Sequence, residues 1–168
     1  PTMAGNYAYL LPNGKLLAAQ KTLEGPATFP GKGGQLIEMD WDGNILWEYT
    51  DHMQHHDFRR LENGNTIYGA WEIMPKEAAA RVQGGRPNTE HENGIYSDVV
   101  KEIDPDGNLV WDWRISRDVE IEKYPLCPIE HRKEFGHINS MQKLENGDVL
   151  ISCRNNHLVA IIDHETKD

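Results

Sequence analysis

The sequence of 168 residues is poor in cysteine, in basic residues and in long apolar runs. Its two cysteines, Cys127 and Cys153, are too few for the disulfide framework that staples small secreted domains. No apolar run approaches the roughly 18 residues that suggest a membrane-spanning helix. The 17 Lys and Arg residues face 27 Asp and Glu residues, and the net charge of −10 would repel a polyanion. We therefore expect neither a membrane segment nor a nucleic-acid partner.

What the sequence does have is a Leu-x-Asn-Gly motif that occurs three times between apolar, strand-like runs. Asn-Gly flanked by alternating apolar and polar residues is a strong signal of a two-residue hairpin turn. Each copy therefore predicts two antiparallel strands. The three copies are Leu11–Gly14, Leu61–Gly64 and Leu144–Gly147.

A second hairpin follows each of the first two copies, with Asp42-Gly43 and Asp106-Gly107 at the tips. The third copy is followed by one more strand, at 158–163, and the sequence then ends within the turn. Four-stranded units that recur at about 40 to 50 residues are typical of a β-propeller. The sequence therefore predicts an all-β fold, a β-propeller of which this chain supplies about two and three-quarter blades of four antiparallel strands.

The repeats also predict how the chain is organised as one partial propeller domain over residues 1–168. A short helix is expected at 76–82, ended by Gly84-Gly85. Because a closed propeller needs at least four blades, we expect the remaining blades on a further stretch of the polypeptide or on another chain, as in a homo-oligomer. An ordinary monomeric fold is the alternative. The expected parts are blade 1 at about 4–50, blade 2 at about 54–114 with an insert at 73–97, an insert at 115–136, and an incomplete blade 3 at about 137–168.

Candidate site residues follow from the innermost strand of each predicted blade, whose side chains alternate toward the central channel. Asn6, His56 and Asn139 each lie five residues before the leucine of a hairpin motif. His137 lies two residues before Asn139, and period-two alternation would put both on one face. We therefore expect His56, His137 and Asn139 to converge on the channel. A bulge would exchange His56 for His55, and the sequence leaves both open.

The second strand of each predicted Asn-Gly hairpin ends in further polar or aromatic residues. Trp71 and Glu72 stand at this position in the second unit, and Arg154 stands there in the third. Arg154 is expected to emerge beside His137, and a guanidinium next to an imidazole suits an anion with several oxygens, such as sulfate, phosphate or carboxylate. The alternative is an ion pair between Arg154 and an acid such as Glu72.

These residues resemble a known family. The segment His55–Phe58 with its Asn-Gly hairpin, followed by Gly136–Ser140 and then by Ile151–Arg154, is similar to the bacterial arylsulfate sulfotransferases. The resemblance covers the chain as a succession of blades and is sharpest from His137 to Arg154, where His-x-Asn precedes Ser-x-Arg. It implies a six-bladed propeller, often periplasmic, that moves a sulfuryl group between phenols through a transient histidine carrier.

The resemblance also implies roles for single residues. It makes His137 and Arg154 ligands of the sulfuryl oxygens, with a histidine of the His55-His56 pair contributing from the preceding blade. Asn139 would support the site, and we expect Trp71 and Glu72 beside the substrates, an aryl sulfate and a phenol. The carrier histidine itself would belong to a later blade, beyond Asp168, and no cofactor is expected.

Two other functions stay open. A metal-dependent lyase or hydrolase could be built on the same channel, with a divalent metal such as Zn²⁺ or Mn²⁺. A propeller that only binds a ligand is the third hypothesis. The glycine-rich segment 31–34 lacks the helix start and the Lys-Ser/Thr ending of a phosphate loop, and we expect a flexible turn there. The candidate metal ligands are His55, His56, Glu72, His91 and His137.

Overall fold

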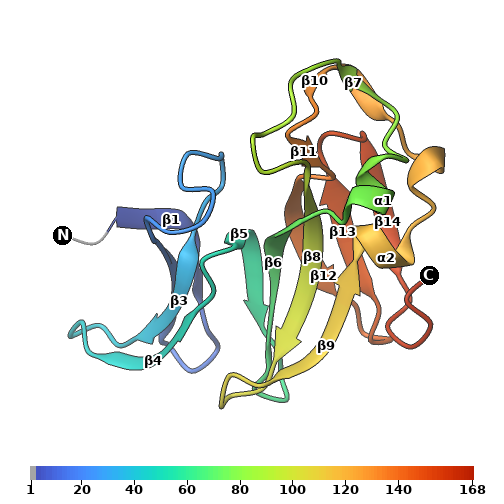
Figure 1. Ribbon diagram of the computed structural model, residues 1–168. Helices are drawn as coiled ribbons and strands as arrows, with labels where there is room; N and C mark the ends of the chain where they lie inside the picture. Colours follow the sequence, from blue (N-terminus) through green and yellow to red (C-terminus); the bar gives the residue numbers. More distant parts are fainter. Residues whose placement is uncertain (1–2) are drawn as a thin grey trace. The chain divides into compact units, whose positions relative to one another are not determined.

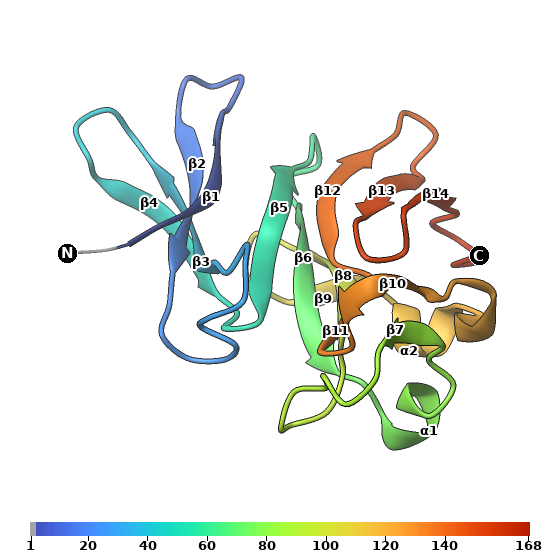
Figure 2. The ribbon, with the colours of Figure 1, turned by 90° about the horizontal axis from the view of Figure 1, so that it is seen from above.

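The computed structural model describes residues 3–168 and consists mainly of antiparallel β-sheet (Figures 1 and 2). None of the described helices is long and apolar enough to cross a membrane. The strands of the first part of the chain are β1 (Met3–Leu10), β2 (Leu16–Lys21), β3 (Gly34–Met39), β4 (Ile45–Thr50), β5 (Gln54–Arg60) and β6 (Thr66–Ile73). The later strands are β7 (Gly84–Arg86), β8 (Tyr96–Ile103), β9 (Leu109–Arg114), β10 (Leu126–His131), β11 (Glu134–Phe135), β12 (Ile138–Lys143), β13 (Val149–Cys153) and β14 (Leu158–Ile162).

The three predicted Asn-Gly hairpins are confirmed. They join β1 to β2, β5 to β6 and β12 to β13, each pair antiparallel. The glycines Gly14, Gly64 and Gly147 have φ values of 79°, 88° and 94°, a region that a residue with a Cβ adopts at a cost. The Asn-Gly signal therefore works because the turn needs a residue with positive φ at this place.

The strands form three larger sheets and one small one. The first has the order β1-β2-β3-β4, the second has the order β11-β8-β6-β5 with β9 paired to β8, and the third has the order β12-β13-β14. The second hairpins, β3 to β4 and β8 to β9, are thus also present. The small sheet pairs β10 with β7.

Both inserts contain short strands that the sequence does not predict, and the first insert contains less helix than expected. Helix α1 covers only Lys76–Ala79, and its N-cap, Pro75, has no side chain that could cap the helix. The expected helix at 76–82 is therefore too long, and Gly84, expected to end it, begins β7 instead. The second insert holds helix α2 (Ile115–Asp118) and a 3₁₀ turn, η1 (Ile121–Lys123). It also supplies β11, which lies parallel to β8.

The chain divides into two compact units, and each has its own buried residues. The first unit comprises residues up to Ala70 together with Lys101–Trp111. The second comprises Trp71–Val100 and Asp112–Asp168. The core of the first unit contains Leu17, Leu36, Phe58, Tyr68 and Ile103. Buried apolar residues of the second unit include Trp71, Val100, Trp113, Phe135, Ile138 and Ile151.

Candidate functional site

A β-bulge interrupts the first strand of each repeat. Pairing jumps from Ala4 to Ala8 in β1, from His55 to Phe58 in β5 and from Ile138 to Ser140 in β12, while the partner strands advance by fewer residues. Bulges re-aim side chains and are common next to active sites. The residues five positions before each hairpin leucine all lie inside these bulges, namely Asn6, His56 and Asn139.

The bulge in β12 affects the expectation that His137 and Asn139 lie on one face of a regular strand. His137 has a φ of 60° and precedes β12, while Asn139 is the extra residue that the bulge inserts. Because the strand is not regularly pleated here, period-two alternation does not assign His137 and Asn139 to one face. His137 is buried and Asn139 is partly exposed.

In the first unit, the bulge brings two imidazoles together. The Nδ1 atoms of His55 and His56 lie 3.0 Å apart, and the two rings meet edge to face. Both side chains are buried. In a hydrogen bond between these atoms one Nδ1 donates and the other accepts, so the pair has the means to hold or pass a single proton. Because the bulge pairs the two rings, it does not single out His55 or His56 as the candidate site residue.

The glycine-rich segment 31–34 holds this pair in place. The amide of His56 donates to the carbonyl oxygen of Gly31 at 2.7 Å, and Lys32 forms a β-bridge with His55. Gly31 has a φ of 80°, and a Cβ there would overlap the imidazole of His56. His56 itself has a φ of 46°, which is uncommon outside glycine. The segment is a close clamp on His56, and the expected turn is present at Gly31, where these contacts hold it.

Lys32 is a buried residue of this clamp, and its role was missed from the sequence. Its ammonium group donates to Thr22 Oγ1 and to the carbonyl oxygens of Gly33 and His52, at 2.7–3.0 Å. Burial lowers the pKa of Lys32 to about 8, against a smaller opposing effect of Asp51. The only signal in the sequence is a lysine among three glycines, where the small neighbours allow the backbone to approach closely.

In the second unit, Asp98 fixes the backbone of the candidate sulfuryl ligand. Its two carboxylate oxygens accept the amides of His137 and Ile138, at 2.6 and 3.0 Å. A side chain at Gly136 would overlap this carboxylate. The buried carboxylate of Asp98, on β8, thus holds His137 in its left-handed conformation at the start of β12.

The imidazole of His137 has its own carboxylate. Its Nδ1 lies 2.8 Å from Glu134 Oε2, and both side chains are buried, with exposed fractions of 6% and 4%. A carboxylate accepts hydrogen bonds, so Nδ1 is the donor in this contact, and the contact fixes the ring's orientation. Glu134 belongs to β11 of the second insert, and the sequence offered no signal for this contact.

Arg154 lies beside His137 through its backbone, as expected, but its guanidinium group is engaged elsewhere. The Arg154 amide donates to the carbonyl oxygen of His137 at 3.1 Å. The guanidinium forms an ion pair with Glu130 at 3.0 Å, and its side chain is 54% exposed. The alternative, an ion pair of Arg154 with an acid, is thus what the structure shows, although the acid is Glu130 of β10 and not Glu72. The second insert therefore supplies a glutamate to each candidate ligand of the sulfuryl oxygens, Glu134 to His137 and Glu130 to Arg154.

The remaining candidates have structural partners. Glu72 forms an ion pair with Arg114 at 2.5 Å and accepts a hydrogen bond from Ser116. Trp71 is 2% exposed and belongs to the core of the second unit. The ring of His91, in the first insert, accepts a hydrogen bond from the Asn93 amide. Among residues 3–168, no three His, Cys, Asp or Glu side chains gather as metal ligands would.

Comparison with known proteins identifies the family to which the chain belongs. A family model described as arylsulfotransferase (ASST) matches residues 7–168, which include both histidine regions and Arg154. A search of curated proteins finds no significant match. The resemblance seen in the motifs is thus confirmed, and the chain belongs to the arylsulfotransferase family.

Proposed function

We propose that the protein moves a sulfuryl group from an aryl sulfate to a phenolic acceptor, with His137 and Arg154 as ligands of the sulfuryl oxygens. The observation that carries this proposal is the family match over residues 7–168. The contacts of the two side chains support the proposal. His137 is held in place by Glu134, and Arg154 can exchange its ion pair with Glu130 for one with the substrate.

Arg154 is the exchangeable ligand. Its ion pair with Glu130 joins a side chain that is 54% exposed to one that is 19% exposed. Surface ion pairs of this kind contribute about 0 to 1 kcal/mol. A sulfuryl group presents several oxygens in a geometry that a guanidinium matches with two hydrogen bonds. Replacing Glu130 by the substrate therefore costs little and gains a more specific contact.

His137 is the fixed ligand. Leaving a buried hydrogen-bonding group without its partner costs about 1 to 3 kcal/mol, so Glu134 stays with the buried imidazole while the substrate binds. The carboxylate orients the ring. Such a group is preorganised to stabilise negative charge on the sulfuryl oxygens in the transition state.

The reaction takes place in two balanced steps. In the first, a nitrogen of the carrier histidine forms a bond to sulfur while the bond from sulfur to the donor oxygen breaks, and the released phenolate takes up a proton. In the second, the acceptor phenol gives up a proton, its oxygen bonds to sulfur, and the bond to the carrier breaks. We assign the proton transfers to the His55-His56 pair and the carrier to a further blade.

The sheets are blades of a propeller in this proposal, and other blades complete the site. The repeated pair of hairpins and the bulge at the same place in each repeat support this arrangement. Asn139 supports the oxygen ligands from its bulge. Trp71 and Glu72 shape the site through the core and through Arg114, rather than by touching the substrate.

The proposal is tested with the full-length protein and 4-nitrophenyl sulfate. We expect release of 4-nitrophenol only when an acceptor phenol is present, with no effect of chelators. Arg154→Ala is expected to lower kcat/KM for the donor about 100-fold. Arg81→Ala is the matched control, because Arg81 also forms an exposed ion pair, with Glu122, in the same unit. No phenol release over a panel of aryl sulfates would rule out the proposed transfer.

A further inference from the structure

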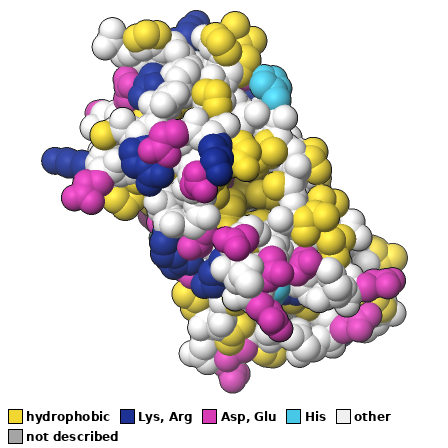
Figure 3. Space-filling model, turned by 90° about the vertical axis from the view of Figure 1, so that its right-hand side faces the viewer, with side chains coloured by type: hydrophobic (Ala, Val, Ile, Leu, Met, Phe, Trp, Pro, Cys, Tyr) yellow, Lys and Arg dark blue, Asp and Glu magenta, His cyan; other side chains and the backbone are white. Residues whose placement is uncertain are grey.

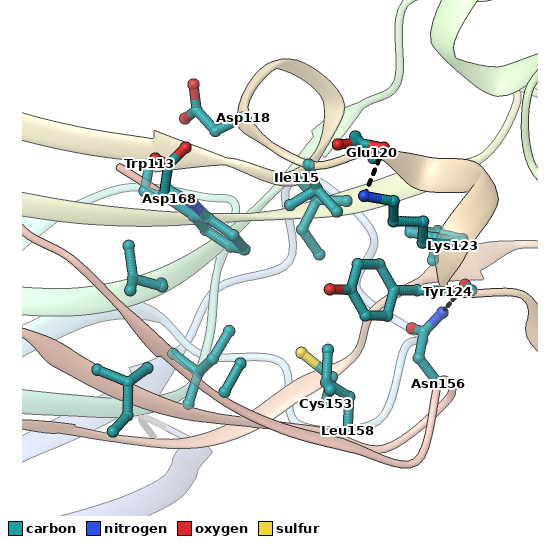
Figure 4. A pocket seen from close by; sticks show the side chains of 16 residues that line it. Trp113, Ile115, Asp118, Glu120, Lys123, Tyr124, Cys153, Asn156, Leu158 and Asp168 are labelled. Atoms are coloured by element: carbon teal, nitrogen blue, oxygen red, sulfur yellow. Dashed lines mark hydrogen bonds and ion pairs between the residues drawn. The ribbon is translucent and has the colours of Figure 1, made fainter. Parts of the chain in front are cut away.

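A cavity with a volume of about 250 Å³ lies within the second unit, and none of the residues proposed to bind the sulfuryl oxygens lines it. Its walls come from β9, α2, η1, β13 and β14, and the hollow is visible among hydrophobic side chains in Figure 3. Figure 4 shows that aliphatic side chains of β13 and β14 form one side and that Trp113, Ile115 and Tyr124 form the other. A cavity of this size holds a single ring rather than a drug-sized molecule.

Two polar groups that line the cavity can accept a hydrogen bond from a ligand. The Oδ1 atom of Asn156 is buried and has no hydrogen-bond partner among the described residues. The other end of this side chain is fixed, because Nδ2 donates to the carbonyl oxygen of Tyr124 at 2.7 Å. The hydroxyl group of Tyr124 points into the cavity (Figure 4). A buried acceptor without a donor is unfavourable, so a ligand that donates to Asn156 gains affinity.

The apolar walls favour a flat, uncharged ring. Trp113 and Tyr124 present aromatic faces and edges to the cavity, and aromatic rings pack well against one another. Cys153 lines the wall as a neutral thiol, since burial raises its pKa. Cys153 therefore contributes a neutral surface to the wall rather than a thiolate.

The charges at the mouth of the cavity disfavour an anion. Asp118, Glu120 and Asp168 line it, against the single cation Lys123. Lys123 is paired with Glu120 at 2.8 Å, and Asp118 is paired with Arg117 at 2.7 Å, which leaves the carboxylate of Asp168. An aryl sulfate would bring its negative charge toward this carboxylate, whereas a phenol is neutral near pH 7.

We propose that this cavity binds a neutral monocyclic phenol, whose hydroxyl group donates to Asn156 Oδ1 and whose ring packs against Trp113 and Tyr124. That the phenol is the acceptor or the product of sulfuryl transfer rests on the proposed function, while the binding itself does not. The cavity is distinct from the oxygen ligands, although Cys153 of its wall directly precedes Arg154 in the chain.

The test is a titration of the full-length protein with 4-methylphenol, followed by NMR at the Trp113 indole N–H and by calorimetry. We expect saturable binding that shifts this resonance. 4-Methylanisole, which lacks the donor, is expected to bind at least about 10-fold more weakly. 4-Methylphenyl sulfate is expected to leave the Trp113 resonance unchanged. Equal affinity for 4-methylphenol and 4-methylanisole would overturn the role of Asn156.

Two variants separate this cavity from other binding surfaces. Ala160→Phe fills the cavity and is expected to abolish the binding of 4-methylphenol. Val159→Phe is the matched control on the same strand, because Val159 is 68% exposed and does not line the cavity. Asn156→Leu is expected to weaken 4-methylphenol at least about 10-fold while 4-methylanisole binds as before. Unchanged binding to Ala160→Phe would overturn the proposal.

The outcomes also distinguish this inference from the proposed function. Binding of 4-methylphenol in a protein that transfers no sulfuryl group would support the cavity and contradict the transferase. Sulfuryl transfer that proceeds equally in wild type and Ala160→Phe, with no phenol bound at Trp113, would contradict the cavity alone.

Discussion

At the scale of single residues, the two glutamates of the second insert have opposite consequences for the candidate site. Glu134 is buried with His137, and Glu130 is paired with the exposed side chain of Arg154. Glu134→Gln is expected to lower kcat/KM for an aryl sulfate about 10-fold or more, because the imidazole loses the charge that orients it. Glu130→Gln is expected to leave kcat/KM equal or higher, since it removes a competitor for Arg154. Steady-state kinetics of both variants check this, and equal losses in both would contradict the assigned roles.

Gly31 and Gly14 test the clamp on His56. Their φ values are 80° and 79°, but a Cβ at Gly31 would overlap the His56 imidazole, whereas nothing lies within 4 Å of a Cβ at Gly14. Gly14→Ala is expected to lower the free energy of unfolding by about 1 kcal/mol, through backbone strain alone. Gly31→Ala is expected to lower it by about 2 kcal/mol more, through the overlap. Urea unfolding measures both, and equal losses would show that His56 is not held by this contact.

Lys32 predicts a pH dependence of stability. Its pKa is about 8 in the folded protein and 10.5 in its ordinary state. Between these values the unfolded chain binds the proton more than the folded protein does, so the free energy of unfolding rises with pH. The rise is at most about 3 kcal/mol from this group. Unfolding at pH 7.5 and 10.5 measures it, and Lys32→Met is expected to show a smaller rise. An identical rise in that variant would contradict the assignment.

At the scale of elements, Asp98 is the contact that joins β8 to the start of β12. Asp98→Asn keeps the shape but replaces one accepting oxygen by a donor, which then faces the amide of His137 or Ile138. We expect a loss of about 2 kcal/mol in the free energy of unfolding. Asp104→Asn, at the exposed turn after β8, is the control and is expected to cost less than about 1 kcal/mol. Denaturant unfolding checks the difference, and equal costs would contradict the bridging role.

The elements also show what the sequence can predict. The hairpins were predictable because Asn-Gly and Asp-Gly turns are local signals that require positive φ at glycine. The bulges in β5 and β12 were not, because alternation alone does not show where a strand takes an extra residue. The parallel pairing of β11 with β8 depends on contacts between distant segments and leaves no periodic pattern in two residues. For that reason the motif singles out His137 and Arg154 as candidates, whereas no motif points to Glu130 and Glu134.

At the scale of the whole chain, the net charge predicts an effect of salt on the donor. A charge of −10 over the 168 residues repels an anionic aryl sulfate, and salt screens this repulsion. The KM for the donor is expected to fall severalfold when the ionic strength rises from about 0.01 M to about 0.15 M. The KM for a neutral phenol should stay constant. Kinetics at a series of salt concentrations test this, and parallel changes for both substrates would indicate another cause.

His137 and Arg154 are proposed to bind the same sulfuryl group. A double-mutant cycle measures this directly, from kcat/KM for an aryl sulfate in wild type, His137→Ala, Arg154→Ala and the double variant of the full-length protein. If both side chains bind one group, the second substitution removes less than it does alone, and the double variant loses less than the product of the single losses. Strictly multiplicative losses, or single variants with wild-type kcat/KM, would show that the two side chains do not bind one sulfuryl group.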